Sequence, residues 1–427
     1  MLLSNRFVQA IKFLCAVTCQ SSSLAILRCI KVTQKKDRIT YEATDLETFL
    51  KIELPVWTQT EGVFVVDAKT LARVQSPIAT RLTDDKVYFG KIAMAYSDAK
   101  DFPSLETGFF KTPVWHNADV FTKDWTQLGK RLSGYTANDD ARGVLNHICI
   151  RAEYMCATNG HILLKEGHEY NLHKIPELVI PPSFFRHISN PFVMDDVVEV
   201  AVYNAGKDER YAVCRGLNFE LVTKMTTDEY PVIDKVIPTK FTHSFTVVRE
   251  VIIAKIREAL SVAGKSKTHM ITFEPAKEKN HYYIRANDSD CGLEFSDILP
   301  VKMNTRKKWQ GVSVNAKHLL TILNDCDTTT VDIRANDSAI TAVGVQPKNQ
   351  KRFFIIMPLR KIDVDDEPAE SKDSAEADDT GQHKPTEPSP DAKDAKGGRQ
   401  VKPNAARNAK DTNAAKDAKQ ARDANDT

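Results

Sequence analysis

Apolar residues at helical spacing occur in six segments of the chain. Phe7, Ile11 and Leu14 recur every three or four residues, which predicts an amphipathic helix over 5–17 with Ser4 as its N-cap. The other predicted helices, with Asp67 and Asn315 as N-caps and Gly264 as a C-cap, are 68–74, 117–132, 181–188, 245–263 and 316–323.

Shorter apolar runs between these helices predict β-strands. The predicted strands are 24–33, 38–44, 48–54, 80–89, 91–96, 144–156, 162–166, 197–203, 210–214, 270–273, 282–286, 293–295, 330–334 and 353–356. Helices and strands therefore follow one another along residues 1–362, and this pattern favours an α+β fold.

The sequence repeats at long intervals. A bulky residue followed by proline occurs at Pro103, Pro231 and Pro358, which are 128 and 127 residues apart. Residues 66–71 (VDAKTL) also reappear as 314–319 (VNAKHL), about two such intervals later.

A second recurring motif supports the same period. The strand-end sequence Ala43-Thr44-Asp45 returns as Ala157-Thr158-Asn159 and again as Ala286-Asn287-Asp288. A long repeat that mixes helix and strand argues against a solenoid and for three similar domains in a row. The predicted domains are 1–112, 113–238 and 239–362, followed by a tail at 363–427.

Three such domains would place their helices on one face and their sheets on the other. Exposed sheet edges favour closure with a second chain, and a closed ring would have the helices lining its hole. The basic residues on or next to these helices are Arg6, Lys12, Lys69, Arg73, Lys123, Lys130, Arg131, Arg186, Lys255, Arg257 and Lys317. They are candidates for phosphate contacts, although any one of them could instead belong to a solvated helix face.

The charge distribution and the cysteines indicate the kind of partner and the cellular compartment to expect. Residues 363–427 carry 16 acidic and 11 basic side chains, whereas the rest carry 41 and 48, a mild basic excess that permits a polyanionic partner. The eight cysteines form no Cys-x-x-Cys pair, which favours free thiols in a reducing cytoplasm. Gln9 and Lys12 interrupt the apolar N-terminal run, so neither a secretory signal nor a membrane span is expected.

The stretch Ala157 to Leu164 allows three interpretations. Asn159-Gly160 predicts a tight turn, His161 could be catalytic, or the segment could belong to a binding surface. No glycine-rich phosphate loop, nucleophile elbow or metal-ligand spacing accompanies His161 or a Cys149–His147 arrangement. We therefore expect no catalytic residue, cofactor or metal, and we interpret His161 as a binding residue.

Several short motifs occur in a fixed order along the three repeats. They are Ser23-Leu24-Ala25-Ile26-Leu27, Thr44-Asp45-Leu46-Glu47, Asp101-Phe102-Pro103-Ser104-Leu105, Ala157-Thr158-Asn159-Gly160-His161, Tyr230-Pro231, Val236-Ile237-Pro238 and Met357-Pro358-Leu359-Arg360. Together they resemble the bacterial-type DNA polymerase III beta sliding clamps over residues 1 to about 362.

This resemblance implies a head-to-tail homodimeric ring that encircles duplex DNA without sequence specificity. It also implies the replicative polymerase, a clamp loader and other proteins with clamp-binding motifs as partners, in the cytoplasm at the nucleoid. Ring closure would join the first domain to the third domain of the neighbour, with Ile92 and Met94 against Leu260 and Val262.

The resemblance further implies a pocket for partner peptides between the second and third domains. Matched by motif, its residues are Arg142, Leu145, Thr158, Gly160, His161, Ile162, Leu163, Pro231, Lys235, Val236, Met357, Pro358 and Leu359. Apolar members would receive a Leu or Phe anchor, although any one of them could instead be ordinary core. Asn159 and Ile162 depart from the family pattern, as do Ser21 and Ser22 where a basic residue is common.

The tail at 363–427 has almost no large apolar residues, Val364 and Val401 being the main exceptions. It cannot bury enough apolar surface to offset the entropy of ordering, so disorder is predicted. Two alternatives to a clamp remain open from sequence: a multidomain scaffold of the same fold that binds no DNA, and an enzyme that uses His161.

Overall fold

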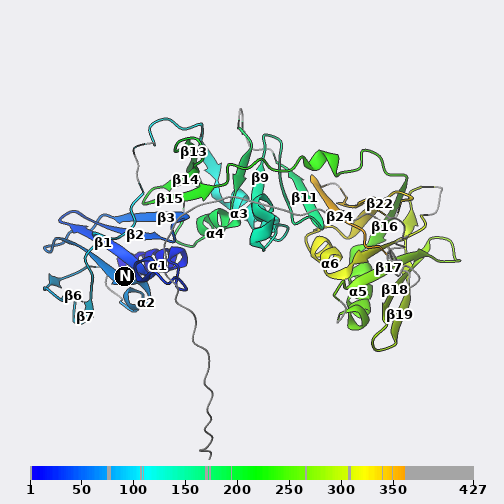
Figure 1. Cartoon of the computed structure of the whole chain (residues 1–427), viewed down its shortest axis with the longest axis horizontal. Helices are drawn as coiled ribbons and strands as arrows, with labels where there is room; N and C mark the ends of the chain where they lie inside the picture. The colour runs from blue at the N-terminus through cyan, green and yellow to red at the C-terminus, as the bar shows by residue number, and fades with distance from the viewer. Residues whose placement is uncertain are drawn as a thin grey trace, which may run out of the picture. The chain divides into compact units, whose positions relative to one another are not determined.

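The order of helices and strands recurs along the chain. The computed structural model describes residues 2–74, 78–105, 108, 110–168, 172, 175–193, 195–264, 267–305, 309–338, 340–348 and 350–360 (Figure 1). The first elements are α1 (Leu2–Val17), η1 (Ala25–Arg28), β1 (Cys29–Lys35), β2 (Arg38–Thr44), β3 (Thr48–Leu54), β4 (Gly62–Asp67), α2 (Ala68–Leu71), β5 (Arg81–Leu82), β6 (Lys86–Phe89) and β7 (Ile92–Ala95). Then follow β8 (Trp115–Phe121), α3 (Thr122–Ser133), η2 (Asp140–Asn146), β9 (Ile148–Ile150), β10 (Tyr154–Thr158), β11 (Ile162–Gly167), β12 (Leu178–Ile180), α4 (Pro182–Ile188), β13 (Val197–Asn204), β14 (Arg210–Gly216), β15 (Phe219–Met225) and η3 (Ile233–Lys235). The last are β16 (His243–Val248), α5 (Arg249–Ala263), β17 (Met270–Pro275), β18 (His281–Asp288), β19 (Leu293–Pro300), β20 (Lys302–Met303), β21 (Val312–Asn315), α6 (Ala316–Asn324), β22 (Thr330–Ala335), β23 (Val343–Pro347) and β24 (Arg352–Ile356).

Two large antiparallel sheets join strands that are far apart in the sequence. The order in the first is β4-β1-β2-β3-β15-β14-β13-β8, and in the second β12-β9-β10-β11-β24-β23-β22-β16-β20. Smaller sheets have the orders β19-β18-β17-β21 and β5-β6-β7. We call the β3·β15 pairing the first junction and the β11·β24 pairing the second junction.

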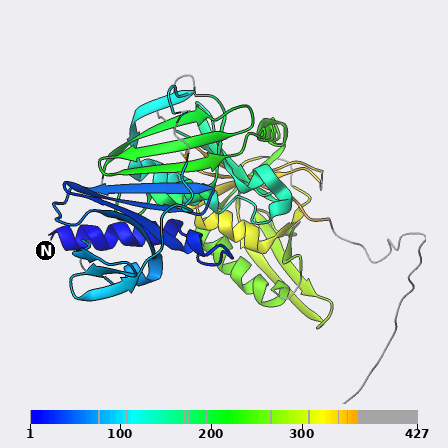
Figure 2. The same cartoon turned by 60° about the vertical axis from the view of Figure 1, so that its left-hand side comes forward.

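The helices pack against one face of the sheets. Phe7, Phe13 and Leu14 of α1 are fully buried, and α1 packs on β2 and β3 (Figure 2). The opposite face of the first large sheet has a separate apolar cluster that includes Tyr203 and Val222. Leu105, from the connection between β7 and β8, covers part of this cluster. Helix α1 and this connection therefore cover opposite faces of the sheet.

Several predicted elements are confirmed. Strands β2 and β3 have the predicted bounds, and the helix that begins beside Pro181 ends at Ile188 as predicted. The side chains of Asp67 and Asn315 accept hydrogen bonds from the backbone N–H groups at the starts of α2 and α6, so both are N-caps.

Two helices were predicted to start too early. Residues 117–121 belong to β8 and residues 245–248 belong to β16, and α3 and α5 begin directly after these strands. Phe121 and Val248 occupy the N-cap positions without a side-chain cap hydrogen bond. No capping residue marks the change from strand to helix, so the apolar residues of the strand and of the helix look like one continuous helical pattern in the sequence.

Other boundaries also needed correction. Helix α1 begins at Leu2, so Ser4 lies inside it, and α2 ends at Leu71 before a turn. The predicted strands 24–33 and 144–156 include the 3₁₀ segments η1 and η2, whose apolar residues prolonged the apparent runs. Strands β4, β12, β15, β20, β21 and β23 were missed, and the tail at 363–427 lies outside the described residues.

Candidate functional site

The turn between β10 and β11 is held by its own side chains. The Asn159 side-chain oxygen accepts hydrogen bonds from the backbone N–H groups of His161, at 2.9 Å, and Ile162, at 3.0 Å. The Thr158 hydroxyl accepts from the N–H of Gly160 at 3.1 Å, and Gly160 has a φ of +86°. Glycine suits this left-handed position because it has no Cβ.

The corresponding turn between β2 and β3 has the same design. Asp45 accepts from the N–H groups of Glu47 and Thr48, and Thr44 accepts from the N–H of Leu46. Leu46 takes the left-handed position with a φ of +78°. The turn is therefore a repeated structural element with the same side-chain-to-backbone hydrogen bonds in both copies.

Segments from three parts of the chain meet at the turn that contains His161. The N–H of Met357, just after β24, donates to the carbonyl of His161 at 2.8 Å. The N–H of Leu359 donates to the carbonyl of Ser313 on β21 at 2.7 Å. The His318 ring, from α6, stacks on the His161 ring with their centroids 5.6 Å apart and 27° between the planes.

Arg142 on η2 borders the same surface. Its guanidinium donates hydrogen bonds to the carbonyl of Asn159 and to Nε2 of His161, the latter at 3.4 Å. Its Nε also lies 3.1 Å from a carboxylate oxygen of Asp139. This arrangement fixes the rim of the site but supplies no carboxylate hydrogen-bonded to His161, as a catalytic pair would require.

An apolar cluster lies beneath this rim. It contains buried Leu163 on β11, Ile355 on β24 and Tyr230, with Leu145 and Met357 packed against it and partly exposed. The Tyr230 hydroxyl accepts a hydrogen bond from the Thr158 N–H at 3.0 Å. Burial raises the pKa of this phenol, so it stays neutral and ties the connection after β15 to the turn.

The structure brings most of the predicted pocket residues together. Arg142, Leu145, Thr158, Gly160, His161, Leu163 and Met357 meet through the contacts above, whereas Pro231, Lys235 and Val236 are exposed on the neighbouring connection. Pro358 and Leu359 are half-buried, and an open cleft of about 690 Å³ is lined by Leu359, Ser313 and exposed Ile340.

Ile162 does not fit the predicted pocket. Its side chain is 2 % exposed and belongs to the main core on the helix side of the sheet. Neighbouring residues of a strand point to opposite faces, so Ile162 cannot share the face of Leu163. Sequence reasoning missed His318, Tyr230 and Ile355 as members of this surface.

Most of the basic residues proposed to face DNA are exposed. They are Lys12, Lys69, Arg73, Lys123, Lys130, Arg186, Arg257 and Lys317, while Arg6 is half-buried over the Phe192 ring. Lys255 instead forms an ion pair with Asp297 of β19, which neutralises its charge.

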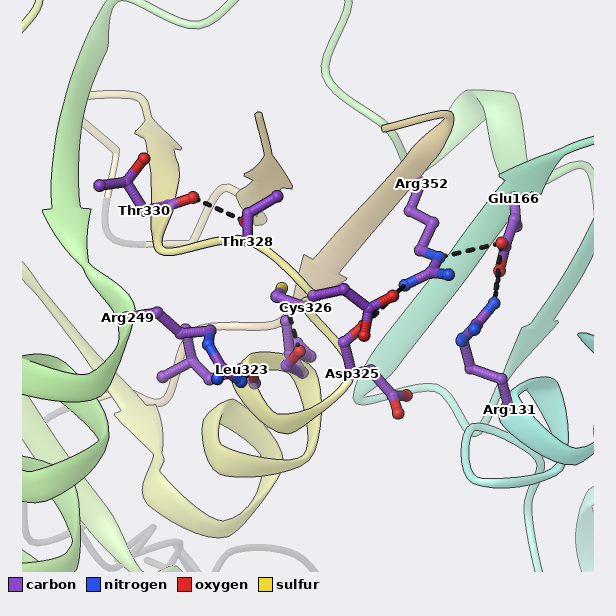
Figure 3. Close-up of polar contacts among 11 residues, drawn as sticks. Arg131, Glu166, Arg249, Leu323, Asp325, Cys326, Thr328, Thr330 and Arg352 are labelled. Carbon is purple, nitrogen blue, oxygen red and sulfur yellow. Dashed lines mark hydrogen bonds and ion pairs between the residues drawn. The ribbon is translucent and has the colours of Figure 1, made fainter. Parts of the chain in front are cut away.

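Arg131 also forms an ion pair, with Glu166. It donates to both carboxylate oxygens of Glu166, at 2.7 and 2.8 Å, and Arg352 of β24 donates to the same carboxylate at 2.9 Å (Figure 3). Arg352 also donates to the carboxylate of Asp327 at 2.7 Å and to the carbonyl of Asp325 at 2.9 Å. This network holds the second junction and leaves Arg131 poorly placed for phosphate contact.

The first junction is apolar at the equivalent positions. At the second junction, Glu166 of β11 lies opposite Arg352 of β24. At the first junction, Ile52 of β3 takes the place of Glu166 and Phe219 of β15 takes the place of Arg352. The Phe13 ring of α1 packs edge-on against Phe219 with their centroids 6.2 Å apart. The two junctions thus share a backbone arrangement but are held by different chemistry.

The predicted dimer residues lie on two elements. On β7, Ile92 is exposed and Met94 is buried, whereas Leu260 and Val262 of α5 are half-buried against the core. All eight cysteines are free thiols, and within the described ranges no cluster of three or more His, Cys, Asp or Glu could hold a metal ion. No helix in the described part of the chain is both long and apolar enough to cross a bilayer.

No protein-family model matches the chain. The chain is 22% identical to a beta sliding clamp of Chlamydia muridarum over 372 residues, which cover 84% of this chain and 98% of that protein. It is 20% identical over 369 residues to a beta sliding clamp of Helicobacter pylori, covering 82% and 95% of the two chains.

Solved structures give the same result for the fold. The DNA polymerase III beta subunit of Thermotoga maritima matches with a TM-score of 0.72 at 18% identity, over 84% of this chain and 98% of that one. The beta subunit of Streptococcus pyogenes matches with a TM-score of 0.70 at 16% identity and the same coverage. The chain is thus a divergent relative of the bacterial beta sliding clamps and has their fold.

Proposed function

We propose that this protein is a DNA sliding clamp, a processivity factor that tethers the replicative polymerase to duplex DNA and has no catalytic activity of its own. The observation that carries the proposal is that the similarity to sliding clamps covers 84% of this chain and 98% of the relative from Chlamydia muridarum. The proposed domains are 1–112, 113–238 and 239–362, and the proposed location is the cytoplasm, at the nucleoid.

The sheet order supports a head-to-tail dimer. In both junctions, the third strand after a long helix pairs with the last strand of the following repeat, as β3 does with β15 and β11 with β24. Among the described strands, the remaining members of this series are β19 and β7, and each lies at an end of its sheet. Pairing of β19 with β7 of a second chain, and the reverse, would close a ring with two further junctions of the same kind.

The exposed basic side chains support binding to the DNA backbone. Lys12 of α1, Lys123 of α3 and Arg186 of α4 are exposed on helices from two repeats. Lysine and arginine bind phosphates through charge, and such contacts give affinity without sequence specificity. This is the property that a ring needs in order to slide.

Charge reversal on these helices tests DNA binding. We expect Lys12→Glu combined with Lys123→Glu to shorten the lifetime of the protein on nicked circular DNA by about tenfold, because phosphate contacts are replaced by repulsion. The measurement is the rate of loss from the circle by gel filtration at low salt. The control is Lys35→Glu, because Lys35 is exposed on β1 on the face opposite α1 and its neighbour across the sheet is Arg38. An unchanged lifetime for the double variant would contradict DNA contact by these helices.

The surface around His161 is the proposed docking site for partner peptides. Partly exposed Leu145 and Met357 offer apolar contacts, and Arg142 and Thr158 offer polar groups near the same rim. Apolar anchors with a few orienting polar groups are typical of peptide recognition. The polymerase, the clamp loader and other proteins with clamp-binding motifs are the proposed users of this site.

Removal of the C-terminal apolar side chains tests the docking site. We expect Met357→Ala, Pro358→Ala and Leu359→Ala together to weaken binding of a polymerase-derived peptide at least about 100-fold, since they remove the anchor contacts. The backbone hydrogen bonds of Met357 and Leu359 are made by N–H groups and do not depend on these side chains. Fluorescence anisotropy measures the affinity, and the control is Leu217→Ala, because Leu217 is exposed in the connection between β14 and β15 and does not line this cleft. Equal affinity of the triple variant and the wild type would refute the site.

A further inference from the structure

Two stacked imidazoles stand at the edge of the proposed docking site. His161 is exposed in the turn before β11, and His318 is half-buried on the first turn of α6. Their ring centroids are 5.6 Å apart. Histidine is the side chain whose ordinary pKa lies within the physiological range.

The contact with Arg142 shows which ring nitrogen of His161 carries the proton. A guanidinium has only donors, so Nε2 of His161, 3.4 Å from Nη2 of Arg142, must be the acceptor. The proton of the neutral ring therefore lies on Nδ1. That N–H and the His318 ring are both available to a group that arrives at the site.

The charges around the pair are mostly positive. Burial lowers the pKa of His318, and His161 and His269 lower it further when they are protonated. Arg142 adds a permanent charge on the other side, although Asp139 at 3.1 Å offsets part of it. An anion at this position would be attracted by Arg142, with Asp139 opposing part of that attraction, and it would favour the protonated form of His318.

We propose that the His161–His318 pair accepts the carboxylate of an acidic residue in a docked peptide, and that docking of such peptides takes up protons. This inference rests on the proposed function of the site as a peptide-docking surface. The neutral His161 ring would donate to the carboxylate from Nδ1, and the carboxylate would stabilise the protonated form of His318. The affinity for acidic peptides therefore rises as the pH falls through the titration of His318. The pair would thereby select among partners by their charge.

The test compares two sets of synthetic peptides that share Leu and Phe anchors. One set carries a single Asp, moved through each position beside the anchors, and the other carries Asn at the same places. We expect the best Asp peptide to gain about tenfold in affinity between about pH 8 and about pH 5, equivalent to a shift of about one pKa unit, while its Asn partner changes little. The window extends to this low pH because the pKa of His318 in the free protein lies below its ordinary value. Isothermal titration calorimetry in buffers of different ionisation enthalpy should show net proton uptake with the Asp peptide only.

A variant separates the role of the pair from that of the docking site. His318→Phe keeps an aromatic ring beside His161, so it should retain Asn-peptide binding and lose most of the pH-dependent gain. His281→Gln, which changes a half-buried histidine on β18, should behave as the wild type. Equal pH dependence of the Asp and Asn peptides, or no proton uptake, would overturn the inference and leave the docking site intact. Absence of binding by either peptide set at any pH would overturn both proposals.

Discussion

Replacing Glu166 by alanine should lower the free energy of unfolding by about 3 kcal/mol, because it leaves Arg131 and Arg352 without their shared counterion. The side chains of Glu166 and Arg352 are each 13 % exposed and that of Arg131 is 20 % exposed, so water replaces the lost carboxylate poorly. Urea-induced unfolding followed by circular dichroism measures the effect. We expect Glu166→Gln to cost less than Glu166→Ala, since the amide oxygen can still accept one hydrogen bond.

The matched control is a surface ion pair. Glu53 lies 3.5 Å from Arg38, and both side chains are more than 40 % exposed. Glu53→Ala should change the free energy of unfolding by less than about 0.5 kcal/mol, because solvent screens such pairs. Similar losses for Glu53→Ala and Glu166→Ala would show that the network at the second junction adds no more than an ordinary surface contact.

Introducing a charge on both of the proposed pairing strands should convert the dimer to a monomer. Ile92 on β7 is 47 % exposed and Ile298 on β19 is 36 % exposed, so Ile92→Asp with Ile298→Asp should leave each chain folded. A carboxylate on each side of a newly formed strand pair would be buried without a partner, a cost of several kcal/mol. Native mass spectrometry should show the wild type at twice 47.9 kDa and the double variant at 47.9 kDa at micromolar concentration.

Val63→Asp provides the control for this experiment. Val63 is 51 % exposed on β4, another end strand, which the proposed ring leaves outside its contacts. This variant should remain a dimer. A wild-type protein that is monomeric at micromolar concentration, or a double variant that remains dimeric, would contradict the β7–β19 pairing.

The sequence predicts an element well where apolar and polar residues alternate regularly along it, or where a capping residue marks its first turn. Strands β2 and β3 alternate between buried and more exposed positions, and α2 and α6 begin at side-chain caps. Strand β15 was missed because Leu221, Val222 and Thr223 are all buried. Val222 is covered by the connection after β7, and such cover from a distant segment cannot be read from local alternation.

Prediction of the candidate site is also limited to features that are local in the sequence. The turn residues and the C-terminal Met357 could be found from local motifs, whereas His318 could not, because its contact with His161 depends on how α6 meets the second junction. Arg131 and Lys255 were assigned to DNA from their charge and their helices. Their partners, Glu166 and Asp297, come from strands, and only the packing of helix on sheet brings these charges together.

The different chemistry of the two junctions gives them unequal responses to dissolved salt. Added salt screens the attraction between Glu166 and its arginines at the second junction. Strongly hydrated salts such as sulfate strengthen the burial of Ile52 and Phe219 at the first junction. The second junction also has buried apolar pairs, such as Leu164 with Phe354, so sulfate strengthens the apolar contacts of both junctions. Within the described residues, only the second junction also has an ion-pair attraction that salt weakens, so the two joints need not respond equally.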